Sequence, residues 1–123
     1  MPSVAGRVNE RLEPLVTVRL VGGPDGRTDV ECVIDTGFVG ADLVLPREVI
    51  DDLGLVVTGF GEVETAGGET IRAEITTGQA EWLGEVRRVS ILIINESRLV
   101  GNQLLDGSRL TVDYGRRTVT VER

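Results

Sequence analysis

The chain has 123 residues, which is enough for one domain with a single hydrophobic core. Its net charge is −7, it contains no His, and all 13 of its basic residues are Arg. These absences exclude Ser–His and Cys–His nucleophile pairs, lysine Schiff bases and His-ligated metal sites. The acidic balance argues against nucleic acid as a partner, because phosphate binding needs a basic patch. We expect no metal and no cofactor, so any chemistry must depend mainly on carboxylates.

The apolar runs are short and only 3% of the residues are aromatic, so the core is expected to be aliphatic. The longest run, Ile91 to Ile94, is the length of a strand and far too short to span a bilayer. A single cysteine, Cys32, cannot form an intrachain disulfide, and the N-terminus does not resemble a signal peptide. We therefore expect a cytoplasmic protein without a membrane contact. Cys32 is interpreted as a packed core thiol, because no base is available to activate it.

In the first half of the chain, residues 1–14 are polar and unpatterned, and they predict a flexible arm before a single domain over residues 15–123. Alternating, β-branched sequences separated by glycine-rich turns then predict strands. A helix is expected after Pro46, with Gly54 placed to terminate it. The expected strands of this half are Leu15 to Val21, Thr28 to Ile34, and Leu43 to Leu45.

The second half continues the pattern of strands. Glu62 to Thr65 and Thr70 to Ile75 flank Ala66, Gly67, Gly68 and Glu69, which predict a hairpin tip. A second pair of strands, Ala80 to Leu83 and Val86 to Ile94, is expected on either side of Gly84, and a last pair on either side of Tyr114 and Gly115. Between these pairs, Leu99-Val100-Gly101 leads into a short helical segment. The sequence therefore predicts an all-β fold with one or two short helices.

Asp35-Thr36-Gly37 follows the strand Val30 to Ile34 and is the most informative motif of the chain. A carboxylate at the end of a buried strand, followed by a hydroxyl and a Gly, offers a compact source of acid–base chemistry. Taken alone, the tripeptide is weak evidence for such chemistry and favours an Asx-type turn that closes a strand.

The order of the elements makes the pattern more specific. The Asp-Thr-Gly loop, a glycine-tipped hairpin, and Leu99-Val100-Gly101 about 65 residues after the aspartate occur in the order found in one protein family. In this respect the chain, over roughly residues 15–121, resembles the retropepsin-like aspartic proteases of the small bacterial type. The resemblance implies a closed β-barrel of the acid-protease fold, in which the apolar-apolar-Gly segment passes under the active-site loop.

The resemblance also implies roles for individual residues. Asp35, Thr36 and Gly37 would be the catalytic motif, with Thr36 joining the loops of two subunits. The tip Ala66, Gly67, Gly68 and Glu69 would be a flap that closes over an extended peptide or protein substrate. Leu99, Val100 and Gly101 would support the active-site loop, as would Phe38. Many relatives carry Ala or Ser at the position of Phe38, so this residue departs from the pattern and could instead be a core plug.

A homodimer is expected, because aspartic protease catalysis uses two carboxylates and the chain has one Asp-Thr-Gly. Asp106-Gly107-Ser108 is a second candidate, but it follows Leu104 and Leu105 and is interpreted as a helix stop. The expected function is an aspartic endopeptidase. Two other hypotheses stay open: a catalytically inactive barrel of the same fold that binds peptides or dimerises, and an unrelated small barrel. In the latter, Asp35 would lie in an ordinary turn and residues 66–69 in a plain surface hairpin.

Overall fold

We analysed a computed structural model of the chain, which describes residues 2–64 and 67–123. Within this part, strands dominate and two short helices are present. The helices are α1 (Arg47–Leu53) and α2 (Asn102–Leu105). The strands are β1 (Ser3–Val8), β2 (Pro14–Val21), β3 (Arg27–Ile34), β4 (Leu43–Leu45), β5 (Gly59–Glu64), β6 (Thr70–Trp82), β7 (Glu85–Ile93), β8 (Leu99–Val100), β9 (Arg109–Asp113) and β10 (Thr118–Glu122).

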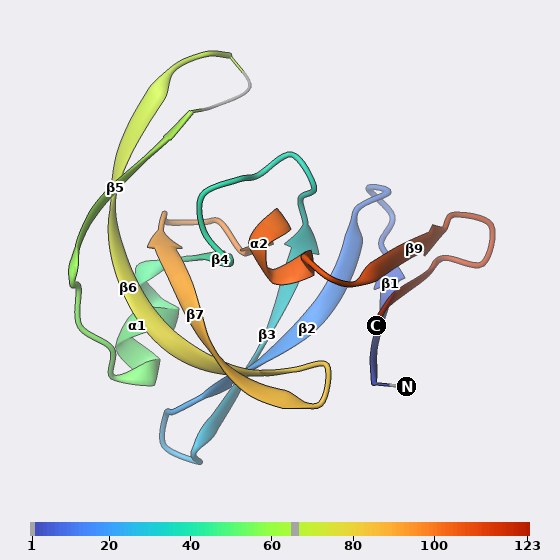
Figure 1. Cartoon of the computed structure of the whole chain (residues 1–123), viewed down its shortest axis with the longest axis horizontal. Helices are drawn as coiled ribbons and strands as arrows, with labels where there is room; N and C mark the ends of the chain where they lie inside the picture. The colour runs from blue at the N-terminus through green and yellow to red at the C-terminus, as the bar shows by residue number, and fades with distance from the viewer. Residues whose placement is uncertain (1, 65–66) are drawn as a thin grey trace.

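The strands pair into one sheet in the order β5-β6-β7-β4-β8-β3-β2-β1-β10-β9. An additional pairing of β6 with β2, through Arg19–Glu81 and Leu20–Ala80, closes six of these strands into a ring. The β5–β6 hairpin extends from this ring on one side, and β1, β9 and β10 lie on the opposite side (Figure 1). The predicted all-β fold is therefore confirmed, and the ring encloses its main core.

The core is aliphatic, as the composition predicted. Large side chains that are almost fully buried include Leu20, Leu43, Leu45 and Ile91, and Trp82 is the one large aromatic group among them. Cys32 is fully buried within this cluster, which confirms its interpretation as a core thiol. Burial of aliphatic surface is worth roughly 25 cal/mol per Å² and is the main source of stability in such a fold.

Most predicted elements are present close to their expected positions. The helix predicted after Pro46 begins at Arg47, with Pro46 as its N-cap, and ends at Gly54. Gly54 has φ of +71°, a left-handed conformation that glycine adopts at little cost. Its backbone N–H donates to the carbonyl of Asp51. This confirms the predicted helix stop.

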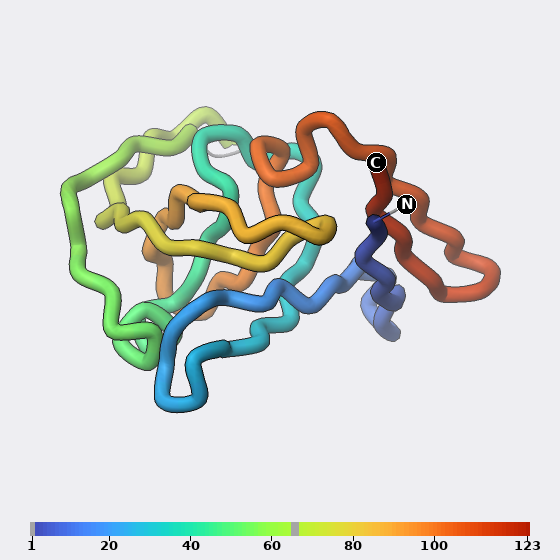
Figure 2. Tube along the Cα trace, turned by 60° about the horizontal axis from the view of Figure 1, so that its bottom comes forward, coloured from blue at the N-terminus to red at the C-terminus, as the bar shows by residue number. Residues whose placement is uncertain are grey.

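The N-terminal arm differs from the prediction. The polar sequence of residues 1–14 predicted a loose segment, but Ser3–Val8 form strand β1, which pairs with β10 and with β2. The two ends of the chain therefore lie close together beside a projecting β9–β10 hairpin (Figure 2). In the structure β1 alternates between exposed and buried or partly buried residues, but its sequence contains a Gly and few large apolar side chains, so the pattern did not predict a strand.

The predicted strands on either side of Thr76 to Gln79 are parts of one 13-residue strand, β6. The residues between the two predicted strands continue the sheet: Thr76 is 3% exposed and its hydroxyl donates to the carbonyl of Val56 at 2.6 Å. Gly78 lies under Leu55 and Ile91, where a Cβ would come within 3.2 and 3.3 Å of their side chains. Tertiary neighbours therefore continue a strand that local polarity did not favour.

Gly101 is packed so closely that it provides a test of the fold. A Cβ at this position would lie 2.7 Å from the carbonyl oxygen of Ala41 and 2.8 Å from the Phe38 ring. We expect Gly101→Ala to lower the free energy of unfolding by about 1–3 kcal/mol, because the backbone must shift to relieve the overlap. Urea unfolding followed by circular dichroism measures this change.

Gly59→Ala is the matched control, since a Cβ there would meet only Ile75 at an ordinary 3.8 Å. Its free energy of unfolding should change by less than about 0.5 kcal/mol. Equal midpoints for both variants would contradict the close packing at Gly101.

Candidate active site

The Asp35 loop begins where β3 ends and is held by β8. Val33 and Ile34 pair in parallel with Leu99 and Val100. The Asp35 N–H then donates to the carbonyl of Val100 at 2.9 Å, which extends this pairing by one step. The backbone position of Asp35 is therefore fixed by Val100, in the apolar segment that the family resemblance implied beneath the loop.

The side chain of Asp35 is half-buried and is oriented by its own loop. Its Oδ1 accepts a hydrogen bond from the Gly37 N–H at 3.0 Å, and its backbone carbonyl accepts one from the Phe38 N–H at 3.2 Å. This is the Asx-type turn that the tripeptide predicted. It leaves Oδ2 free of that turn while Thr36 and Gly37 lie exposed beside it.

The loop closes tightly over the segment after β8. The Asn102 N–H donates to the carbonyl of Phe38 at 3.0 Å, and the Gly101 N–H donates to the carbonyl of Asp42 at 2.9 Å. The Phe38 ring packs toward Gly101 and against a small apolar cluster of Ala41, Val44 and Leu92. Phe38 is thus partly buried between the loop and this cluster, and its influence on any activity stays a prediction.

One face of the β5–β6 hairpin is directed toward the Asp35 loop. Val63, Ala73 and Ile75 alternate onto the same face of the hairpin and pack against the same cluster of Ala41, Val44 and Leu92. A Cβ at Gly40 would lie 3.6 Å from a methyl group of Val63. The hairpin and the Asp35 loop are therefore in contact through an apolar surface.

At the hairpin tip, Gly67, Gly68 and Glu69 are exposed, and Gly68 has φ of +82°. Ala66, which was predicted to belong to the flap tip, lies outside the described residues, as does Thr65. The predicted hairpin is present, with β5 longer than expected at its beginning. Its role as a flap stays a prediction.

One residue of this region was missed by the sequence reasoning. Asp42 is 7% exposed, and its Oδ2 accepts hydrogen bonds from the N–H and the hydroxyl of Ser90, at 2.8 and 3.2 Å. A possible signal was its position immediately before the apolar run Leu43 to Leu45, where a charged side chain is forced close to the core. Its partner is 48 positions away and could not be identified from the sequence.

The other candidate groups are not brought to Asp35 as reactive groups. Burial raises the pKa of Cys32 from 9.0 to about 12, and the nearby Arg98 only partly opposes this shift, so the thiol stays protonated. Asp106 follows the last residue of α2, and Gly107 has φ of +81°, as expected for a helix stop.

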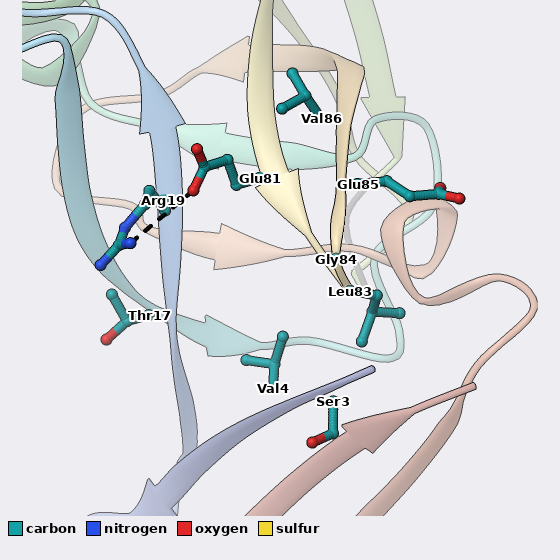
Figure 3. Close-up of a pocket in the computed structure, with 9 residues that line it drawn as sticks. All are labelled: Ser3, Val4, Thr17, Arg19, Glu81, Leu83, Gly84, Glu85 and Val86. Atoms are coloured by element: carbon teal, nitrogen blue, oxygen red, sulfur yellow. Dashed lines mark ion pairs between the residues drawn. The ribbon is translucent and has the colours of Figure 1, made fainter. Parts of the chain in front are cut away.

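A surface pocket of about 550 Å³ lies elsewhere, between β1, β2 and the β6–β7 turn (Figure 3). Its charged groups are already paired: Arg19 contacts Glu81 at 3.9 Å and Asp29 at 3.0 Å, and Glu85 contacts Arg123 at 3.3 Å. None of its lining residues belongs to the Asp35 loop or to the β5–β6 hairpin tip. We therefore place the candidate site at Asp35 and not in this pocket.

Two features are absent from residues 2–64 and 67–123. No group of three or more His, Cys, Asp or Glu side chains is arranged to hold a metal ion. In the same residues, no helix is both long and apolar enough to cross a bilayer.

Comparison with known proteins supports the resemblance at the level of the fold. No profile of a known protein family matches the sequence, and no curated protein matches it. Among solved structures, the chain is similar to the crystal structure of a retropepsin-like aspartic protease from Rickettsia conorii, with a TM-score of 0.64 and 15% sequence identity. The match covers 97% of this chain and 88% of that one. The chain therefore has the retropepsin-like fold.

Proposed function

We propose that the protein is an aspartic endopeptidase that acts as a homodimer, with Asp35 from each subunit in one active site. The observation that carries this proposal is the placement of Asp35. In a retropepsin-like fold, its carboxylate lies at the end of β3, its Oδ1 accepts the Gly37 N–H, and its backbone is held by Val100. A carboxylate fixed in this way, half-exposed and without a basic partner in the ion pairs of the described residues, is suited to proton transfer.

The chemistry requires a second carboxylate. Two carboxylates about 3 Å apart cannot both ionise, so the pair holds one proton. The carboxylate pairs of aspartic proteases behave in this way. The ionised Asp35 then removes a proton from a water molecule, which attacks the peptide carbonyl. The protonated Asp35 of the partner subunit polarises that carbonyl and later protonates the leaving amine. Since each chain has one Asp-Thr-Gly, a two-fold axis beside the exposed Thr36 supplies the pair.

The surroundings of Asp35 are suited to an extended apolar substrate. The inner face of the β5–β6 hairpin carries Val63, Ala73 and Ile75, and it contacts the loop that follows Asp35. Val39 on this loop is 69% exposed. A peptide bound as an added strand would make main-chain hydrogen bonds and place alternate side chains against these groups. The hairpin would exclude water during the reaction.

Replacing the proposed base tests the function directly. We expect Asp35→Asn to preserve the fold and to abolish cleavage of an unbiased peptide library between about pH 4 and 7, because the amide cannot accept the proton. Asp106→Asn is the matched control and should retain turnover, since Asp106 follows a helix end. Turnover by Asp35→Asn above a trace would contradict the assignment of Asp35 as the base. A lack of cleavage by the unmodified protein, with no binding of a statine inhibitor, would contradict the proposed function.

Thr36 is proposed to join the two active-site loops, because it is exposed next to Asp35 in the isolated chain. Each lost hydrogen bond is worth about 0.5–1.5 kcal/mol, and two are lost in Thr36→Ala. We expect the dimer Kd, measured by sedimentation over a concentration series, to rise about 5-fold to 150-fold. Thr118→Ala, on the exposed side of β10, should leave the Kd unchanged. If Thr36→Ala removes activity at saturating protein without altering the Kd, Thr36 acts on the substrate or the carboxylate instead.

The hairpin tip is proposed to act as a flap that opens and closes. Gly68 has φ of +82° with no atom within 4 Å of an added Cβ, and Gly107 has φ of +81° with the same open space. Both Gly68→Ala and Gly107→Ala should therefore cost a similar amount of stability, about 1–2 kcal/mol. We expect only Gly68→Ala to slow turnover, by several-fold, because it hinders closure. Hydrogen exchange of residues 67–74 should also slow when a peptide-like inhibitor binds. Equal turnover of the two variants, together with unchanged exchange, would identify an ordinary hairpin.

A further inference from the structure

Asp42 is a buried carboxylate that the proposed chemistry does not use. It is the one charged side chain among the described residues that is buried, with 7% of its surface exposed. None of the ion pairs formed by residues 2–64 and 67–123 includes it. A carboxylate removed from water without a cationic partner is costly unless it accepts hydrogen bonds.

Ser90 on β7 provides these hydrogen bonds. Oδ2 of Asp42 accepts from the Ser90 N–H at 2.8 Å and from its hydroxyl at 3.2 Å. In return, the Asp42 N–H donates to both the carbonyl and the hydroxyl oxygen of Ser90, at 3.1 and 3.0 Å. Gln103 on α2 donates to the same hydroxyl at 3.4 Å. Two donors thus converge on one carboxylate oxygen, whose lone pairs accept both hydrogen bonds.

This pair lies at the end of the loop that carries Asp35. The loop begins at Asp35, where the backbone is bonded to Val100, and it ends at Asp42, whose carbonyl accepts the Gly101 N–H. Both ends are thus fixed to the β8 segment, but only the Asp42 end is also fixed to β7 through a side chain. The Asp42 end therefore determines how far the loop can move away from β7 and α2.

We propose that Asp42 is a positioning residue that holds the Asp35 loop in its reactive geometry by binding Ser90. This inference rests on the proposed function for its effect on turnover, but the loop geometry can be measured independently. The effect is local: without the carboxylate, the loop keeps the backbone bonds of Asp35 to Val100 and of Asp42 to Gly101 and Ser90, and it loses the two bonds that Ser90 donates to the Asp42 side chain. A displacement of the catalytic carboxylate by about 1 Å is sufficient to lower kcat by up to about 100-fold.

The test compares Asp42→Ala, Asp42→Asn and Ser90→Ala with Asp52→Ala, an exposed carboxylate on α1 that serves as the control. With a peptide substrate and enough protein to saturate the dimer, we expect Asp42→Ala to lower kcat about 10-fold to 100-fold, with KM changed less than about 3-fold. Asp42→Asn retains one oxygen for the two donors and should restore most of kcat. Ser90→Ala, which keeps the backbone N–H donor, should give an intermediate value, and Asp52→Ala should equal the unmodified protein.

A second measurement does not depend on activity. Amide hydrogen exchange of residues 36–41 and of Gly101 should be faster in Asp42→Ala than in the unmodified protein, while exchange in β9 and β10 stays unchanged.

If the unmodified protein cleaves no peptide, the proposed function fails, and the exchange data alone decide whether Asp42 positions the loop. If Asp42→Ala does not fold, Ser90→Ala takes its place as the variant that weakens the bond, and Asp42→Asn stays the variant that keeps it. In Asp42→Ala, or in Ser90→Ala if Asp42→Ala does not fold, an unchanged kcat, a kcat that falls only with the folded fraction, or unchanged exchange in the loop would overturn the proposal.

Discussion

The insertion of β8 between β3 and β4 is the constraint on which the candidate site depends. This two-residue strand pairs in parallel with β3 and antiparallel with β4, so the loop that joins β3 to β4 must pass over the residues that follow it. The overlap is possible because residue 101 has no side chain, with Ala41 and Phe38 occupying the space that a Cβ would need. The position of Asp35 is therefore a consequence of packing beneath the loop as much as of the loop sequence.

The loop carries two carboxylates, Asp35 and Asp42, that have different surroundings. Asp35 is half-exposed and is bonded to a neighbouring backbone amide, so it keeps an oxygen for other partners. Asp42 is buried, and one of its oxygens is occupied by two donors of Ser90. Seven positions apart in the sequence, one carboxylate is available for chemistry and the other is part of the scaffold. The difference comes from burial and donor number, because the two side chains are chemically identical.

The apolar surface shared by the loop and the β5–β6 hairpin links the fold to the proposed reaction. Val63 and Ile75 on the hairpin pack with Val44 and Leu92 of the body in a cluster separate from the main core. A separate small cluster buries less area than the main core, and its contacts are correspondingly easier to open. A hairpin held by such contacts can rest against the body and still move, which a lid over a peptide requires.

The sequence by itself determined the local features of this protein. The alternation from Leu15 to Val21 predicted β2, and Gly54 predicted the end of α1. Asp35-Thr36-Gly37 was predicted in a loop after a strand and lies after β3, whereas the position of Leu99-Val100-Gly101 beneath this loop was implied by the family resemblance. These features depend on neighbouring residues, on side-chain periodicity and on the backbone angles that glycine permits.

Only the tertiary structure decided which distant segments meet. It paired β1 with β10 and β2, joined two expected strands into β6, closed the ring through β2 and β6, and buried Asp42 against Ser90. Each of these outcomes depends on neighbours far away in the sequence: Asp42 and Ser90 are 48 positions apart, and β1 and β10 come from opposite ends of the chain. Burial and strand pairing are properties of that assembled neighbourhood, so a weakly patterned strand or a single charged residue does not reveal them before the chain has folded.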